Sequence, residues 1–538
     1  MCPNMDDVGF ELGRVVSVAG SGVSVLLEPG SGQAAPLSAL QVGAVVRIPT
    51  PGSVVFGMIA SLRIENPSSK PDDIETGFAE VELLGEELLA TDDHSARPFQ
   101  RGVSIYPGLG SITYTATRDD LSRVYARPQQ ANVRIGALHQ DRSLGAYLAT
   151  DELLGKHFAV LGTSGSGKSC TVALILRAIL DQHPAGHIIL LDPHNEYARA
   201  FGDRAELVNT STLRLPYWLL DFQETAEILI GRDNANRETE RSILKDAMME
   251  AKQQYLGDSP DAAFLTVDTP TPYRMQAVVQ FIDNAMGRLD KPETSAPYLK
   301  LRQRIDALST DSRFAFMFSG MFVSDDLPEI IARLFRLPVD GRPITIVDLS
   351  GVPSEIVEVV VSMLCRTIFN FNLWSEREKA VPVLLVCEEA HRYVPRDEAD
   401  AFPSTRQAIA RIAKEGRKYG VSLCLISQRP SELSASVLSQ CNTLFALRMS
   451  NQTDQDFVAN ALPDGARGLL AALSSLKTQE AIGVGEAVSV PMRLTFADLQ
   501  ESTRPHSGTA SFSKGWQESA TKPDHVDDTI GRWRRQTR

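Results

Sequence analysis

Residues 162–169 read Gly-Thr-Ser-Gly-Ser-Gly-Lys-Ser, in which two glycines enclose four residues and a Lys-Ser pair follows. The apolar residues 157–161 before this stretch predict a buried strand, and the unbroken apolar run 171–180 after it predicts a helix. A strand, a glycine-rich loop and a helix in this order surround an anion with backbone N–H groups and the positive end of the helix. The stretch therefore predicts an α/β fold built around a phosphate-binding loop.

The loop and the first residues of the helix supply the predicted contacts to ATP. They are Gly162, Thr163, Ser164, Gly165, Ser166, Gly167, Lys168, Ser169 and Cys170. The Lys168 ammonium would reach the β- and γ-phosphates, and the Ser169 hydroxyl would ligate Mg²⁺. The alternative, a glycine turn formed by chance, gives no reason for the strand and the helix on either side.

Composition sets the broad class of the protein. The chain has 538 residues, of which 43% are hydrophobic and 22% charged, and these values predict a mostly globular protein of several domains. The formal net charge of −13 argues against a surface that attracts nucleic acid everywhere, but it leaves a local basic channel open. Six cysteines without C-x-x-C spacing, and no recognisable signal or membrane-spanning stretch, predict a reduced, cytoplasmic protein without a membrane partner.

Residues 1–130 differ in pattern from the rest of the chain. They contain short β-branched segments separated by Gly, Pro and Ser, namely 15–18, 23–27, 45–48, 54–59, 78–84 and 112–115. Several short strands at this spacing predict a small β-barrel, with a hairpin tip at residues 67–73. No catalytic group of residues is recognisable here, so a structural or assembly role is expected.

The remaining chain predicts an α/β core interrupted by helices. Further buried strands are expected at 187–191, 343–349, 381–387, 421–426 and 443–449, a long helix at 354–374 and a closing hairpin at 481–496. Residues 131–219 and 336–500 would form the core, 220–335 a helical insertion, and 501–538 a tail. Proline turns at 270–272 and 292–297 would divide the insertion. Its cations Lys300, Arg302, Arg304 and Arg313 are expected to form a solvated face.

Polar residues follow the predicted strands where ligand chemistry gathers in parallel sheets. Glu388 and Glu389 come directly after strand 381–387. The first would hold the Mg²⁺ shell, and the second would orient and polarise the attacking water. Asp192 follows strand 187–191, and Gln428 follows strand 421–426, where a polar side chain can sense the γ-phosphate. The alternatives are a surface acid pair and polar turns that only end strands.

With these motifs placed, the chain resembles the HerA family of hexameric DNA translocases, within the HerA–FtsK group of RecA-like ATPases. The matching stretches are 156–162, 192–197, 388–393, 415–420 and 427–430. The resemblance implies an N-terminal β-barrel, a RecA-like ATPase core with a helical insertion, and a homo-hexamer that binds ATP between neighbouring subunits.

The resemblance also implies roles for single residues. Asp192 would be the acid near the metal and water, Gln428 the polar sensor, and Arg417 the arginine finger supplied to the neighbouring subunit. Arg411 and Arg448 are alternatives for the finger. Many members of the family have aspartate where this chain has Glu388, whose longer side chain can still reach the Mg²⁺ shell.

The function implied is an ATP-hydrolysing motor that translocates or unwinds double-stranded DNA. Relatives work with a separate nuclease or a sirtuin-like effector subunit, in DNA end processing or defence against phage, and this chain has no recognisable nuclease acid cluster of its own. A first alternative is an ATPase ring that scaffolds and activates an effector enzyme. A second is a secretion coupling ATPase at a membrane.

Overall fold

The computed structural model describes residues 9–27, 40–65, 77–89, 98–209, 212, 215–230, 236–288, 292–318, 323–352, 354–397, 402–461, 467–506, 512–517 and 524–535. The hairpin tip predicted at 67–73 lies outside these residues. The chain divides into two compact units, the first comprising Met1–Gly186, Phe371–Ala401 and Ile409–Leu499, and the second comprising the rest. The domain boundaries expected from the sequence stay predictions.

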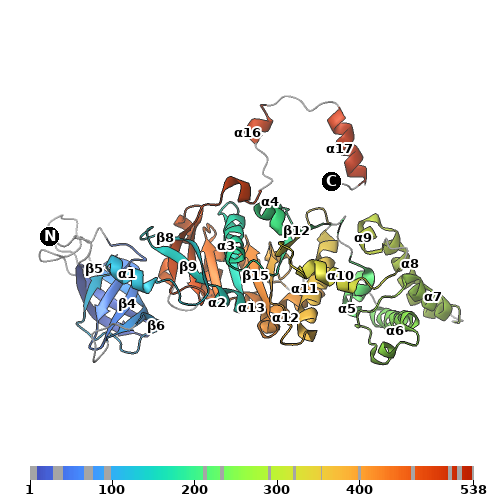
Figure 1. The fold of residues 1–538 in the computed structure, drawn as a ribbon, viewed down its shortest axis with the longest axis horizontal. Coiled ribbons are helices and arrows are strands. Elements are labelled where there is room, and N and C mark those ends of the chain that lie inside the picture. The colour runs from blue at the N-terminus through green and yellow to red at the C-terminus, as the bar shows by residue number, and fades with distance from the viewer. Residues whose placement is uncertain are drawn as a thin grey trace. The chain divides into compact units, whose positions relative to one another are not determined.

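The N-terminal strands of the first unit form a closed β-barrel (Figure 1, blue). They are β1 (Glu11–Ala19), β2 (Gly22–Leu27), β3 (Val45–Pro49), β4 (Ser53–Ile64), β5 (Gly77–Leu88) and β7 (Ile112–Thr115), and the short β6 (Gln100–Arg101) adds to β5 outside the ring. Antiparallel pairing of β2 with β5, with Leu26 opposite Phe78, closes the ring. Alternate side chains such as Val23, Val25 and Leu27 point into an apolar interior. The predicted barrel is confirmed.

The same unit contains the strands that carry the phosphate loop. In sheet order they are β14 (Val383–Cys387), β15 (Val421–Ser427), β10 (Phe158–Leu161), β16 (Thr443–Leu447), β17 (Glu480–Gly485), β18 (Met492–Phe496), β8 (Asn132–Leu138) and β9 (Gly145–Ala149). The first four run parallel and the others pair antiparallel. The four parallel strands are buried along nearly their whole length, as sheets covered by helices on both faces require.

Helices of the first unit include α1 (Arg118–Val124), α2 (Thr150–Gly155), α3 (Lys168–Gln182), α13 (Ala435–Leu438), α14 (Gln452–Ala461) and α15 (Arg467–Leu470). The first of them begins with a capping box, in which Thr117 and Asp120 exchange hydrogen bonds with each other's backbone N–H. Helix α3 packs against β10 and β8. The predicted α/β core preceded by a small β-barrel is confirmed.

The second unit has a parallel three-stranded sheet and the predicted helices. Its strands are β12 (Ala205–Val208), β13 (Ile344–Asp348) and β11 (Ile188–Asp192). Its helices include α4 (Ala198–Phe201), α5 (Phe222–Leu229), α6 (Arg237–Leu256), α7 (Met275–Met286), α8 (Pro292–Thr310), α9 (Ala315–Phe318), α10 (Leu327–Phe335), α11 (Ser354–Trp374), α16 (Phe512–Gly515) and α17 (Asp524–Arg535).

Two sequence predictions are wrong in this unit. The expected turn at 292–297 is instead the start of α8, which begins at Pro292 and continues through Pro297. Proline is tolerated at the first position of a helix, where an N–H has no intrahelical partner, whereas Pro297 inside α8 removes one hydrogen bond and crowds the preceding turn. No membrane-spanning stretch was expected, yet Ile356–Trp374 is long and apolar enough to span a membrane by composition. Since 72% of it is buried inside the protein, it is accounted for as a core helix.

The cations of the insertion are paired with acids. The contacts are Arg302 Nε to Asp283 Oδ1 at 2.8 Å, Arg304 to Glu240 at 3.0 Å, Arg313 to Asp311 at 2.6 Å and Lys300 to Glu240 at 3.9 Å. Pairing of this kind removes most of the net positive charge of the group. It agrees with the expectation that these residues form a solvated face rather than an anion site.

A buried ionic contact joins α5 to α11. The Glu224 carboxylate, which is 1% exposed, accepts hydrogen bonds from Ser362 Oγ at 2.7 Å and from Arg366 Nη2 at 2.8 Å. Arg366 Nη2 also donates to the carbonyl of Leu219 at 2.6 Å. Glu224 closes a capping box at the start of α5 as well, so one side chain fixes both helices.

Replacing Glu224 by alanine is expected to lower the unfolding free energy by about 3 kcal/mol, because the buried Arg366 would keep the carboxylate of Asp221, at 3.2 Å, but lose that of Glu224, and the capping box of α5 would be lost. Thermal unfolding of the purified variant measures the effect as a drop in Tm. Glu250→Ala is the matched control, since Glu250 is half-buried on α6 and its carboxylate accepts a hydrogen bond from Gln254 at 3.1 Å, while among the described residues no ion pair to another helix is broken. Equal melting temperatures for the two variants would contradict the assignment.

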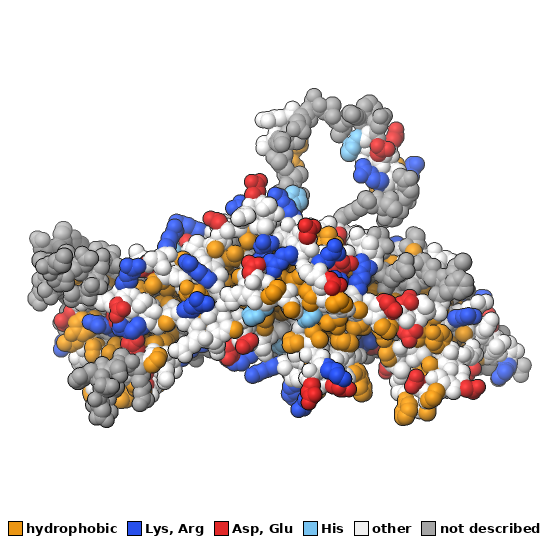
Figure 2. Space-filling model, viewed as in Figure 1, with side chains coloured by type: hydrophobic (Ala, Val, Ile, Leu, Met, Phe, Trp, Pro, Cys, Tyr) orange, Lys and Arg blue, Asp and Glu red, His pale blue; other side chains and the backbone are white. Residues whose placement is uncertain are grey.

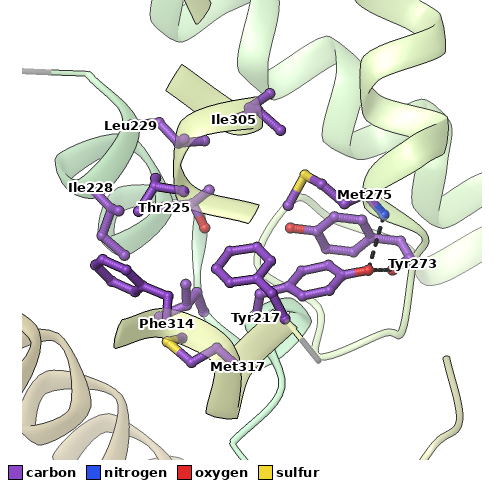
Figure 3. A pocket seen from close by; sticks show the side chains of 12 residues that line it. Tyr217, Thr225, Ile228, Leu229, Tyr273, Met275, Ile305, Phe314 and Met317 are labelled. Carbon is purple, nitrogen blue, oxygen red and sulfur yellow. Dashed lines mark hydrogen bonds between the residues drawn. The ribbon is translucent and has the colours of Figure 1, made fainter. Parts of the chain in front are cut away.

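An apolar cavity of about 20 Å³ lies among the helices of the insertion (Figure 3). Tyr217 lies at its wall, stacked on Phe318 with ring centroids 5.0 Å apart. Its hydroxyl donates to the carbonyl of Tyr273 at 2.7 Å and accepts from the N–H of Met275 at 2.9 Å. The space holds about one water-sized sphere and its walls are apolar, so it is a packing gap rather than a ligand site.

Candidate active site

The phosphate loop follows β10 and turns sharply into α3. Gly165 and Gly167 have φ values of 73° and 101°, a left-handed backbone that residues with a Cβ atom rarely adopt. At Gly162 a Cβ would come within 2.8 Å of Leu447 Cβ and of Ser166 Oγ. These three glycines therefore allow both the curvature of the loop and its close approach to β16.

Hydrogen bonds hold the loop in this shape. Ser166 Oγ and Lys168 Nζ donate to the carbonyl of Thr163 at 2.7 Å and 3.2 Å. The N–H and the hydroxyl of Thr163 both donate to the carbonyl of Arg448, each at 3.0 Å. The loop is thereby tied to the residue that follows β16.

The start of α3 fits an anionic ligand. Gly167 precedes it without a side-chain cap, and its first turn contains no acidic residue, so no side chain of that turn neutralises the positive helix end. Lys168 is buried with its ammonium in the loop, while Ser169 and Cys170 are half-buried in the first turn. This arrangement suits the phosphates of a nucleotide.

Two neighbouring strands bring the predicted carboxylates and sensor to the same edge of the sheet. Strand β15 lies between β14 and β10, and all three are parallel. Leu161 pairs with Ser427, and the N–H of Gly162 donates to the carbonyl of Ser427 at 3.3 Å. Because parallel strands end at the same edge, Glu388, Glu389 and Gln428 lie at the edge that carries the phosphate loop.

Both predicted catalytic acids are buried. Glu388 is 3% exposed and Glu389 is 6% exposed. Glu389 has a left-handed backbone with φ of 52°, which is unfavourable for a residue with a side chain. A buried carboxylate at Glu388 and the hydroxyl of Ser169 offer oxygen donors, which Mg²⁺ prefers, so the two residues fit the predicted metal.

A histidine next to the acid pair was not assigned a role from the sequence. His391 Nδ1 lies 3.3 Å from Glu389 Oε2 and 3.1 Å from Ser427 Oγ. Burial lowers the pKa of His391, which keeps its ring neutral near pH 7. Because parallel strands end at one edge, the sequence could have indicated that Ser427 lies near the acid pair. The direction of the His391 side chain could not be predicted from strand order.

Asp192 belongs to the second unit, and its carboxylate organises the turn after β11. Its two oxygens accept the N–H of His194 at 3.2 Å and the N–H of Tyr197 at 3.0 Å. Burial raises the pKa of Asp192. The backbone hydrogen bonds lower it, but burial is the larger of the two effects. The contacts account for an acid at this position, while its predicted role near metal and water stays a prediction.

The three arginines considered for the finger lie in different places. Arg417 is exposed in the turn Gly416–Tyr419 before β15, at the sheet edge opposite the phosphate loop. Arg411 is exposed on helix α12 (Pro403–Glu415), with its Nε 3.9 Å from Glu415 Oε2. Arg448 is half-buried beside the phosphate loop of its own chain. The assignment of the finger to Arg417 stays a prediction.

Comparisons with known proteins agree with this arrangement. A family model described as the central domain of helicase HerA matches residues 133–368. The DNA double-strand break repair helicase HerA of Pyrococcus furiosus is 27% identical over 437 residues, covering 75% of each chain. The helicase of the same name from Sulfolobus acidocaldarius is 26% identical and covers 72% of each.

Solved structures with some likeness were also found. VirB4 of Thermoanaerobacter pseudethanolicus matches 70% of this chain and 98% of its own, at 17% identity and a TM-score of 0.49. The bacterial conjugative coupling protein TrwB matches 70% of this chain and 97% of its own, at 15% identity and a TM-score of 0.44. The sequence relatives confirm the resemblance that the motifs predicted: the chain is similar to the HerA helicases, and residues 133–368 match the central domain of that family.

Proposed function

We propose that this protein is a DNA-translocating motor that hydrolyses ATP and acts on double-stranded DNA as a ring of six copies. One observation carries the proposal: the phosphate loop and the acid pair Glu388–Glu389 meet at one edge of a sheet, in a chain similar to HerA helicases. A phosphate grip and a buried carboxylate are the two parts that nucleotide hydrolysis requires.

The proposed chemistry gives each of these groups a role. Lys168 and the N–H groups at the start of α3 bind the β- and γ-phosphates of ATP, and Gln428 contacts the γ-phosphate. Ser169 and Glu388 would hold Mg²⁺, which would supply positive charge beside the phosphate oxygens. Glu389 accepts the proton of the attacking water as its oxygen bonds to the γ-phosphorus and the bond to the β-phosphate oxygen breaks.

The ring is proposed because a single ATPase domain performs no work on a polymer. When each site is completed by an arginine from the neighbouring copy, hydrolysis at one interface changes the contact between two subunits. A partner nuclease or sirtuin-like effector would supply any further chemistry, in DNA end processing or phage defence, and a cytoplasmic location is expected. The relatives whose names describe helicases favour the motor over the scaffold and secretion alternatives.

The described residues on the face drawn in Figure 2 do not offer the cluster of basic residues that DNA binding requires, so such a cluster must lie on another face. Among the side chains coloured there, Lys and Arg are scattered between Asp and Glu and form no continuous basic field. With a net charge of −13, the protein as a whole does not attract a polyanion. The proposal therefore places the DNA in the central pore of the ring, where cations of six copies add.

Double-stranded DNA is expected to raise ATP hydrolysis, and the rise should shrink steeply as salt increases. Phosphate contacts release counterions, so several such contacts lower DNA affinity about a thousandfold between about 50 and about 200 mM salt. Phosphate release and DNA binding are measured together across this range, with Lys168→Ala as the control that binds DNA without hydrolysis. If DNA changes neither quantity at low salt with the partner present, the motor is excluded and the scaffold alternative takes its place.

A further inference from the structure

We propose that His391 is a positioning residue that holds the Glu389 carboxylate in place for hydrolysis and ties it to the end of β15 through Ser427. The inference rests on the proposed function, because it assigns Glu389 as the group that accepts the proton of water. It adds a residue to the site for which the sequence motif had given no role.

The geometry places one nitrogen between two oxygens. His391 Nδ1 lies 3.3 Å from Glu389 Oε2 and 3.1 Å from Ser427 Oγ. The His391 side chain is 12% exposed, that of Glu389 is 8% exposed, and Ser427 is buried. Water therefore competes little for these contacts, and a polar contact in such a setting is stronger than one at the surface.

The charge of the carboxylate decides the tautomer of the ring. An ionised carboxylate only accepts hydrogen bonds, so Nδ1 must carry the hydrogen for the contact with Glu389 to be attractive. Ser427 Oγ already accepts the N–H of Arg429 at 3.0 Å, which fixes its position at the strand end. The hydrogen bond of Nδ1 goes to this backbone-anchored hydroxyl, and Glu389 Oε2 lies 3.3 Å from the same nitrogen as a charged neighbour rather than as its hydrogen-bond acceptor.

Glu389 is a residue that needs such support. Its backbone is left-handed, with φ of 52°, and it caps the short turn Ala390–Arg392 on which His391 itself stands. A glutamate side chain has several staggered rotamers, and activation of water requires one that directs an oxygen toward the γ-phosphate. A donor on the same turn, held in turn by β15, restricts that choice.

The link to β15 also fits the position of the sensor. Ser427 directly precedes Gln428, and its carbonyl accepts the N–H of Gly162 at the start of the phosphate loop. Ser427 therefore contacts His391 beside Glu389, precedes the predicted sensor Gln428 and bonds to the start of the phosphate loop. A merely structural role for His391 would be met by the hydrogen bond to Ser427 and would leave kcat unchanged in a stably folded variant.

The test uses substitutions that move the donor. Asparagine places an N–H close to the position of Nδ1, whereas glutamine places it near Nε2 and alanine removes it. We expect His391→Asn to keep kcat within about threefold of the natural protein, while His391→Ala and His391→Gln lose about ten- to a hundredfold in kcat. KM for ATP should stay constant, since the residue does not touch the nucleotide. Arg392→Ala, at an exposed position of the same turn, is the control and should change neither value.

A second measurement separates action through Glu389 from a general effect on the fold. In a Glu389→Gln background the acid no longer accepts a proton, so adding His391→Ala should lower the residual single-turnover rate no further. The proposal would be overturned if His391→Ala lowered the single-turnover rate of Glu389→Gln by the same factor as it lowers the rate of the natural protein. Normal kcat in a stably folded His391→Ala would overturn it as well. Normal turnover in Glu389→Gln alone would instead overturn the proposed role of Glu389, which keeps the two failures apart.

Discussion

Replacing Glu389 by glutamine is expected to leave ATP binding intact and to slow hydrolysis by about two to four powers of ten. Loss of a positioned general base commonly costs this much, because the amide has the same size but does not take up a proton. Steady-state phosphate release gives the rate, and binding of a fluorescent ATP analogue gives the affinity.

Lys168→Ala serves as the contrasting variant for this measurement. Lys168 has its ammonium in the phosphate loop, hydrogen-bonded to the carbonyl of Thr163, so its removal should weaken nucleotide binding itself. The two variants thus fail at different steps, and the pair distinguishes phosphate binding from activation of water. Near-normal turnover in Glu389→Gln would show that another group accepts the proton.

Replacing Arg417 by alanine is expected to lower ATP hydrolysis by about three to five powers of ten without preventing ring assembly, as loss of an arginine finger does in other phosphoryl-transfer enzymes. The structure gives a reason why it cannot act on its own ATP. Arg417 precedes the seven-residue strand β15, whereas the phosphate loop lies at the other end of that strand. At about 3.3 Å per residue the two ends are roughly 20 Å apart, beyond the reach of one side chain.

Mixing two inactive variants tests action on the neighbouring subunit. In rings that contain both Arg417→Ala and Lys168→Ala copies, some interfaces join an intact phosphate loop to an intact arginine, so part of the activity should return. Lys418→Ala is the matched control, because Lys418 is an exposed cation in the same turn before β15 and is not a candidate for the finger. No recovery in demonstrably mixed rings would count against Arg417 acting in trans. Full activity of Arg417→Ala alone would leave Arg411 and Arg448 as candidates.

Much of the fold could be predicted because local pattern and tertiary burial agree. The barrel strands and the buried strands around the phosphate loop are short apolar or β-branched runs between turn residues. Strands β14 and β15, for example, lie within or close to the runs predicted at 381–387 and 421–426. Closure of the barrel by β2 and β5 depends on pairing between distant segments, which no local pattern contains. The start of α8 was missed because proline marks both turns and the first residues of helices.

The candidate site divides in the same way. The phosphate loop, Glu389 and Gln428 each follow a predicted strand. Because parallel strands end at a common edge of the sheet, their proximity could be predicted from the sequence alone. Contacts that depend on side-chain direction could not be foreseen, among them that of His391 with Ser427 and the turn held by Asp192. Strand ends determine which residues are near one another, but rotamers determine which atoms meet.

The left-handed backbone at Glu389 has a consequence for attempts to engineer this protein. A residue with a side chain is about 1–2 kcal/mol less favourable than glycine in that conformation. Any selection that rewards heat resistance alone therefore favours glycine at position 389, and the variants it enriches will have lost the carboxylate. Directed evolution of a more thermostable variant must therefore select for ATP turnover and thermal stability together. At position 389 thermal stability alone favours glycine, whereas turnover favours glutamate.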